Sequence, residues 1–291
     1  MPMGSHDSTN NFDRRSSVHK IWGLGDTGIE LQRGRNVKSY ELPAHFHDDY
    51  QFMLVDSGAR EINFRGDRRV FGSEYLTIVN PGETHSTGCL GDHGSSFKTM
   101  HLPVSAWAKR SDELGISSNE PLFPFEVENG YVLKVFGRLH EVIESEGITL
   151  RSEELLTEFA DILVGSCKLR RLRNGKTIGV ERKLCLVRDY IEDNYAKTLI
   201  LDELATLAGL NKYHLLRSFA AAFGMPPHAF QIRVRLNKAK RMLSGGMRIK
   251  QVAAATGFAD PSHFGKHFIR SIGFTPRNYQ RAVDARLKAQ R

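Results

Sequence analysis

Residues 252–279 of the chain read VAAATGFADPSHFGKHFIRSIGFTPRNY, and residues 204–230 read LATLAGLNKYHLLRSFAAAFGMPPHAF. The two stretches share one pattern of apolar residues, glycines and prolines. Gly209 recurs 48 residues later as Gly257, whereas the positions that follow the turn recur 49 residues later. The extra residue falls just after Gly257, where a loop tolerates an insertion. The repeat therefore indicates two copies of one structural unit.

Each copy carries the signals of a helix, a tight turn and a second helix. The glycine in each turn suits the left-handed conformation that ends a helix, and the first helices are predicted over 202–208 and 249–256. Asn211 and Asp260 suit the N-caps of the second helices, and Pro261 follows at a first helical position. Helix, glycine-containing turn and helix make a helix-turn-helix unit, whose second helix lies in the major groove of DNA.

The second helix of each copy has one apolar and one polar face. Leu215 and Phe219 recur at helical spacing in the first copy and are predicted to face the core. Phe264 and Phe268 do the same in the second copy. The opposite faces carry side chains that donate hydrogen bonds to base edges and phosphates. These candidate DNA-contacting residues are Lys212, Tyr213, His214, Arg217 and Ser218 in the first copy, and Ser262, His263, Lys266, His267 and Arg270 in the second.

A single helix is predicted between the two copies, over 230–243. Its apolar positions can pack on both units, and a rigid connection would hold the two second helices in successive major-groove segments, roughly 10 bp apart. Its cations are predicted to form salt bridges or to contact phosphates: they are Arg233, Arg235, Lys238, Lys240 and Arg241.

The charge of the chain is concentrated in its second part. Residues 1–175 carry a net charge of −5, and residues 176–291 carry +13. A basic segment of this size points to a polyanionic partner, which agrees with double-stranded DNA. The three cysteines have no disulfide or zinc-ligand spacing, and no signal peptide or membrane-spanning run is recognisable, so we expect a cytoplasmic protein without a membrane partner.

The N-terminal part has the texture of β structure. Short apolar or alternating runs at 50–55, 60–64, 75–79 and 97–102 are separated by turn residues, which predicts a small sandwich or barrel over residues 18–125. Residues 1–17 are polar and are predicted to be disordered.

Two amphipathic helices are predicted after the β structure, within residues 126–169. They run over 131–146 and 152–169, with Ser152 as the N-cap of the second. The pair either covers the barrel or forms a dimer interface, or does both. A basic linker, 170–180, precedes the helical domain, 181–291. The fold class is therefore α+β with two domains.

Residues 201–280 resemble the DNA-binding domain of AraC-type (AraC/XylS) transcription regulators. The resemblance runs through LATLAGLNKYHLLRSF, RVRLNKAKRML and VAAATGFADPSHFGKHFIRSIGFTPRNY. It implies two helix-turn-helix units joined by a linker helix. Lys266 stands where this family more often has arginine, and a lysine cannot make the bidentate contact that arginine makes with guanine. The family's base-contacting positions fall on Tyr213, His214, Arg217, Ser262, His263 and Lys266.

The N-terminal stretch also resembles the sensor half of that family, a cupin-like β-barrel. The matching segments are HFHDDYQFMLVDSG, 45–58, and VNPGETHS, 79–86. The preferred interpretation is a small-molecule effector inside the barrel, because imidazole, phenol and amide groups can orient a polar ligand. The candidate effector-binding residues are His45, His47, Tyr50, Gln51 and His85.

A metal ion is the alternative occupant of the three histidines. In metal-binding cupins two histidines one residue apart are joined by a third from a later strand, but a carboxylate completes the set where this chain has Gln51. We therefore assign no metal and no other cofactor from the sequence.

The sequence predicts a DNA-binding transcription regulator that responds to a small molecule, and the family resemblance favours an activator. The helices near 131–169 predict a homodimer, and RNA polymerase is a further expected partner. Two alternatives remain. One is a constitutive or architectural DNA-binding protein whose barrel only dimerises, and the other is a metal-dependent cupin enzyme. No Ser/His/Asp set, phosphate-binding loop or dinucleotide motif is recognisable, so we expect no catalysis.

Overall fold

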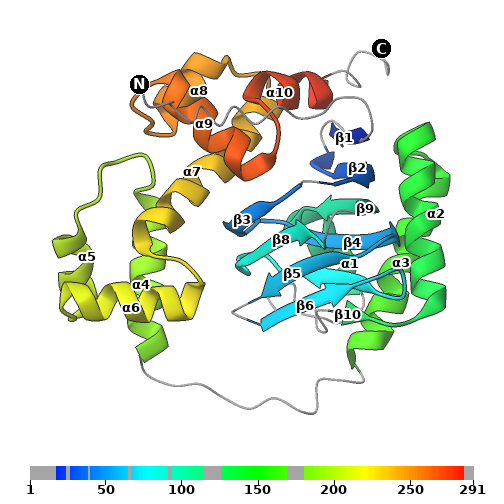
Figure 1. Ribbon diagram of the computed structural model, residues 1–291, viewed down its shortest axis with the longest axis horizontal. Helices are drawn as coiled ribbons and strands as arrows, with labels where there is room; N and C mark the ends of the chain where they lie inside the picture. Colours follow the sequence, from blue (N-terminus) through cyan, green and yellow to red (C-terminus); the bar gives the residue numbers. More distant parts are fainter. Residues whose placement is uncertain are drawn as a thin grey trace, which may run out of the picture.

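A β-rich N-terminal half and a helical C-terminal half lie against each other (Figure 1). The computed structural model describes residues 18–23, 27–38, 40–64, 67–90, 94–113, 126–168 and 180–284. The segment predicted to be disordered lies outside these residues, as does the predicted linker up to residue 179.

The strands form two facing sheets, whose antiparallel pairs make the predicted barrel-like domain. The six-stranded sheet has the order β1 (Val18–Gly23), β2 (Glu30–Val37), β9 (Ser95–Leu102), β4 (Tyr50–Ser57), β7 (Leu76–Val79) and β10 (Glu126–Val127). The four-stranded sheet has the order β3 (Leu42–His45), β8 (His85–Cys89), β5 (Arg60–Phe64) and β6 (Asp67–Phe71).

The four strands predicted from apolar runs are confirmed as β4, β5, β7 and β9. Successive side chains of β4 point to opposite faces of the sheet and therefore pack in different cores. Tyr50 and Phe52 point to an apolar core between the six-stranded sheet and the helices, whereas Met53 packs between the two sheets. The polar strand β8, HSTGC, has no apolar run by which the sequence could reveal it. It is held in the sheet by pairing with β3 on one side and β5 on the other.

Helices cover the outer face of the six-stranded sheet (Figure 1). They are α1 (Val104–Glu113), α2 (Gly130–Glu146) and α3 (Leu150–Lys168). Phe136 and Phe159 pack against Phe52 of the sheet, so the predicted covering role of the helical pair is confirmed. Dimerisation through this pair stays a prediction.

The predicted N-cap of the second of these helices was wrong. α3 begins at Leu150, two residues before Ser152. The backbone amide of Thr149 donates to Ser152 Oγ at 2.8 Å, and the Ser152 amide donates to Thr149 Oγ1 at 3.4 Å. This reciprocal pair satisfies two amides at the start of the helix, so Thr149 is the cap and Ser152 is its partner in the first turn.

Seven helices among the described residues form the C-terminal half. They are α4 (Val180–Asp193), α5 (Leu201–Ala208), α6 (Lys212–Phe223), α7 (Pro227–Ser244), α8 (Ile249–Ala255), α9 (Pro261–Ile272) and α10 (Pro276–Asp284). The first half of α7 shares a core with α4–α6, and its second half shares a core with α8–α10. α7 is thus the helix predicted to join the two units.

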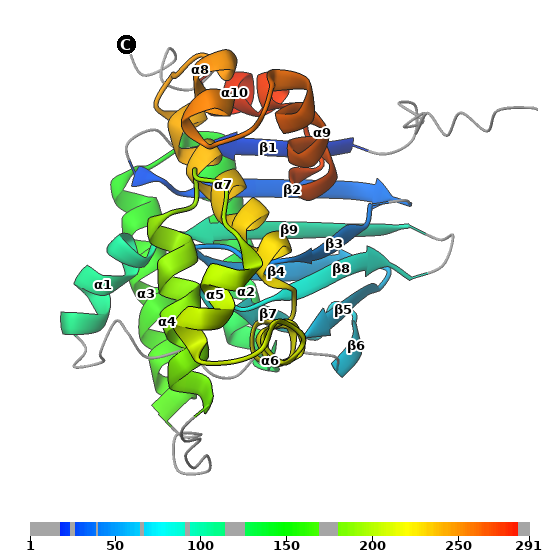
Figure 2. The same cartoon turned by 90° about the vertical axis from the view of Figure 1, so that its left-hand side faces the viewer.

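The helical half packs directly on the barrel, an arrangement that no local sequence pattern predicts. α10 lies beside β1, and α9 lies beside β3 (Figures 1 and 2). Ile21 of β1 belongs to the core of the second unit, and Phe46 stacks on Phe230 with ring centroids 4.7 Å apart. Within the described residues, no helix is both long and apolar enough to cross a membrane.

Candidate nucleic-acid interface and effector site

The first helix-turn-helix unit has the predicted turn chemistry. Gly209 adopts φ +60° after α5, and the Asn211 side chain accepts a 2.8 Å hydrogen bond from the His214 amide. Leu215 and Phe219 are fully buried. On the other side of α6, Lys212, Tyr213, His214 and Arg217 are exposed or half-buried, as is Ser218.

The second unit repeats this arrangement with a stronger cap. Asp260 accepts hydrogen bonds from the amides of Ser262 and His263, and these bonds lower the pKa of its carboxyl group. Phe264 and Phe268 are fully buried. On the outer side of α9, Ser262, His263 and Arg270 are exposed, Lys266 reaches solvent, and His267 lies beside Phe258.

The cations of α7 do not all point to solvent, which limits their availability for phosphates. Arg235 donates to the backbone oxygens of Tyr195, Lys197 and Gly257 at 2.7–3.0 Å, so it ties the turn of the second unit to the loop before α5. The residue is only 9% exposed. Arg235 therefore positions both units relative to each other, a role that the sequence analysis missed.

Other polar residues of α7 hold the barrel. Arg233 donates to the Ala44 carbonyl oxygen at 3.1 Å, and Asn237 donates to Asp48 at 2.9 Å. The Lys240 ammonium forms a 2.8 Å ion pair with Glu30, which also accepts a 2.9 Å hydrogen bond from the Tyr279 hydroxyl. Figure 2 shows α7 running along the barrel between the two helix-turn-helix units.

The Glu30–Lys240 pair is enclosed, with exposed fractions of 8% and 9%. Burial alone would raise the pKa of Glu30, but the ammonium group of Lys240 beside it makes the net direction downward. Both groups are therefore charged at neutral pH.

Lys240→Met is expected to reduce the free energy of unfolding by about 3–5 kcal/mol, because it leaves the Glu30 carboxylate buried without a cation. Urea denaturation measures this. Glu30→Gln/Lys240→Met removes both charges and is expected to be more stable than the single variant. Equal stability of the wild type and Lys240→Met would mean that the pair contributes nothing to the docking.

Four of the five candidate effector residues come together, and one does not. His45, His47 and Gln51 line a small cavity of about 40 Å³ between the sheets, and His85 lies against both histidines. Tyr50 lies apart, packed against Trp107 on the opposite face of β4, because neighbouring residues of a strand point to opposite sides.

His101 of β9 joins this group and was missed by the sequence analysis. Its ring centroid lies 4.6 Å from that of His47. Burial lowers the pKa of His101 to about 3 and that of His85 to about 4, and it holds the pKa of His45 and His47 well below the ordinary value. The imidazoles are neutral at physiological pH.

A larger cavity, of about 510 Å³, lies between the barrel and the helical half. His47 lines it, alone among the candidate effector residues. The remaining polar lining comes from both halves: Thr27, Glu30, Asp48, Asp49 and Ser105 from the N-terminal half, and Asn237, Lys240, Arg241, Ser244 and Tyr279 from the C-terminal helices.

Comparison with known proteins also divides the chain into a ligand-binding half and a DNA-binding half. Residues 28–160 match the AraC-like ligand binding domain, and residues 204–282 match a helix-turn-helix domain. The chain is 30% identical over 237 residues to the uncharacterized HTH-type transcriptional regulator YbfI of Bacillus subtilis, which covers 81% of this chain and 85% of YbfI. The chain belongs to the AraC family of transcription regulators.

One further curated relative bears on function, and one solved structure bears on the fold. The HTH-type transcriptional activator RhaS of Klebsiella pneumoniae is 23% identical over 262 residues, which covers 85% of this chain and 90% of RhaS. The unsaturated fatty acid-bound structure of ToxT from Vibrio cholerae has a TM-score of 0.55 and 15% identity, covering 93% of this chain and 97% of ToxT. That likeness shows the two-domain fold. YbfI and RhaS are named as transcription regulators, and the helix-turn-helix domain makes DNA the partner of this chain.

Proposed function

We propose that this AraC-family protein is a transcription activator whose DNA binding is controlled by a polar small molecule in the cavity between the barrel and α7. The observation that carries the proposal is the lining of this 510 Å³ cavity by both domains, including the helix that joins the two DNA-binding units. A volume of this size suits a metabolite. The RhaS likeness favours activation, and ToxT, a protein of this fold, binds an unsaturated fatty acid in its crystal structure.

The barrel holds the two recognition helices, α6 and α9, in different directions. α6 is seen end-on in Figure 2, whereas α9 is seen from the side. Successive major-groove segments on one face of a straight duplex are parallel, so simultaneous entry requires the units to turn relative to each other. Thr84 Oγ1 donates to the Phe223 carbonyl oxygen at 2.5 Å, and His19 packs on Phe274, so barrel contacts reach both units.

A ligand in the cavity shifts this equilibrium only if it binds one arrangement more tightly than the other. Asp48 receives hydrogen bonds or ion pairs from Asn237 and Arg241 across the cavity wall, at 2.9 and 3.0 Å. A polar ligand that competes for these groups loosens the docked arrangement. The effector site is then at the edge of the barrel rather than inside it.

The proposed regulator acts as a homodimer, through the solvent-facing side of α2 and α3, and contacts RNA polymerase from a promoter. Sedimentation of the full-length protein with and without a bound site tests the first point. A promoter response that ignores every metabolite would instead favour the architectural alternative.

Ser244→Trp is expected to abolish the effector response of a reporter gene while leaving basal DNA binding within about twofold, because the indole fills the cavity from its rim. The reporter carries a promoter bound by the protein and is measured across growth conditions. Ser73→Trp, at an exposed position between β6 and β7 outside both the cavity lining and the proposed dimer interface, is the matched control. An unchanged response in Ser244→Trp would place the effector elsewhere.

A further inference from the structure

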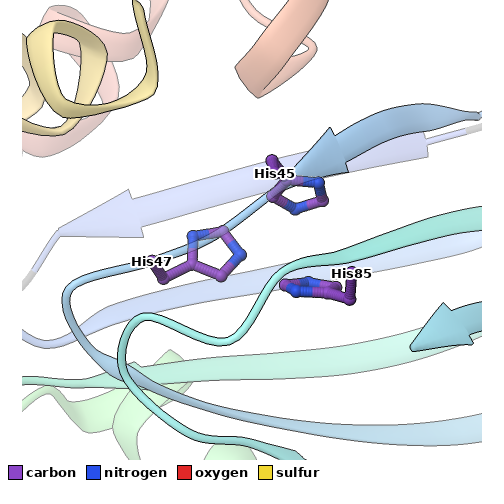
Figure 3. Close-up of side chains that lie close together, drawn as sticks. All are labelled: His45, His47 and His85. Carbon is purple, nitrogen blue, oxygen red and sulfur yellow. The ribbon is translucent and has the colours of Figure 1, made fainter. Parts of the chain in front are cut away.

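We infer that His45, His47 and His85 form a binding site for a divalent transition metal ion of the zinc or nickel kind. One ring nitrogen from each of the three residues lies within 4.8 Å of the others. The ring centroids are 4.2–5.2 Å apart, and Figure 3 shows the three rings gathered around one point between β3 and β8. A tetrahedral ion with metal–nitrogen bonds of about 2.1 Å holds its ligands roughly 3.4 Å apart, so small ring rotations close the site.

The hydrogen bonds around the cluster orient the rings as metal ligands. His45 Nδ1 donates to the Pro43 carbonyl oxygen at 2.8 Å, and His85 Nδ1 donates to the Glu83 carbonyl oxygen at 3.2 Å. A ring that donates from Nδ1 to a carbonyl presents the lone pair of Nε2, which is the common outer-shell arrangement of metal-binding histidines. The Nε2 atoms of His47 and His85 are buried and have no hydrogen-bond partner. A metal ion would satisfy both.

No metal was assigned from the sequence because the fourth ligand of metal-binding cupins, a carboxylate, is absent. The structure shows another imidazole near the three histidines. Gln51 replaces the carboxylate of metal-binding cupins, but His101 lies 4.6 Å from His47 by ring centroids, and its Nδ1 is likewise buried without a partner. A donor set of imidazoles selects zinc, nickel, cobalt or iron(II) over magnesium and calcium, which prefer oxygen. The proposed donor set is therefore three imidazoles, with the imidazole of His101 next to His47.

The ligands are flanked by the residues that hold α7. Ala44 accepts the hydrogen bond from Arg233, and Asp48 accepts that from Asn237. Because His45 and His47 lie between these two anchors, a metal ion that fixes both rings also fixes the segment on which α7 is docked. This regulatory consequence rests on the proposed function, whereas metal binding itself does not.

The test measures zinc and nickel binding by the full-length protein. The protein is purified without a histidine tag and is stripped of metal with a chelator before the measurement. Competition with a chromophoric chelator and elemental analysis are expected to give one equivalent per chain. His85→Gln is expected to weaken binding by more than the roughly 10–100-fold that loss of an outer-shell partner costs. His47→Gln, at a half-buried position, gives the same test if His85→Gln does not fold.

The chain offers a sharp control, because His263 and His267 on α9 approach within 3.1 Å and form a surface pair that can also hold metal. His263→Gln is expected to leave the single equivalent in place. Loss of the metal from His263→Gln, its retention by both cluster variants, or a content well below one equivalent would each overturn the inference. DNA binding by the metal-free protein is measured separately, and its absence would count against the proposed function rather than against the site.

Discussion

Gly257→Ala is expected to lower the free energy of unfolding by about 3 kcal/mol or more. Gly257 has φ +76°, a conformation that residues with a Cβ rarely adopt, and an added Cβ would lie 2.1 Å from the Ala196 carbonyl oxygen. The turn also supplies the carbonyl oxygen to which Arg235 donates. Strain here therefore reaches both helix-turn-helix units. Urea denaturation of the full-length protein measures the change.

Gly137→Ala is the matched control, because it adds the same methyl group inside α2 with no atom within 4 Å and no positive φ. It is expected to stabilise the protein by up to about 1 kcal/mol. Similar stabilities of the two variants would contradict the assignment of Gly257 to the strained turn.

Arg217→Ala and Lys266→Ala are each expected to weaken sequence-specific DNA binding by about 1–3 kcal/mol, or roughly 5–150-fold, with the fold intact. Both side chains lie on the outer faces of α6 and α9, opposite fully buried phenylalanines. Each is expected to relax specificity in one half of the bound site only. Titration of labelled wild-type and half-scrambled sites at fixed salt measures affinity and specificity together.

Arg68→Ala removes an exposed cation from β6, outside both recognition helices and outside α2 and α3, and serves as the control. It is expected to leave specific affinity unchanged within about twofold. An equal loss in the control and in the two α6 and α9 variants would mean that only total charge matters and that these helices do not read bases.

The DNA-binding half was predictable because its signals are local. A glycine at positive φ, an Asn or Asp cap three residues from its amide partner and a proline at the first helical position act within one turn of chain. Repetition of those signals in two copies then determined the architecture. The Ser152 cap failed because Thr149 and Ser152 are both capping residues, and the pattern alone does not decide which of them begins the helix.

Contacts between residues far apart in the chain could not be predicted. Lys240 and Arg235 read as surface cations on an amphipathic helix, but Glu30 and the Tyr195 carbonyl oxygen meet them from other elements. The same holds for His101, which reaches the cluster only because the register of β4 and β9 sets it opposite Gln51. The docking of α7 on the barrel therefore emerges only from the tertiary structure.

The central claim is that both recognition helices read DNA. Selection of bound fragments from the source genome, with purified full-length protein at near-physiological salt, tests it most directly. We predict enriched sites with two half-motifs roughly 10 bp apart, beside genes that the protein activates. Binding that is blind to sequence and lost with modest added salt, with or without cell metabolites, would contradict the account.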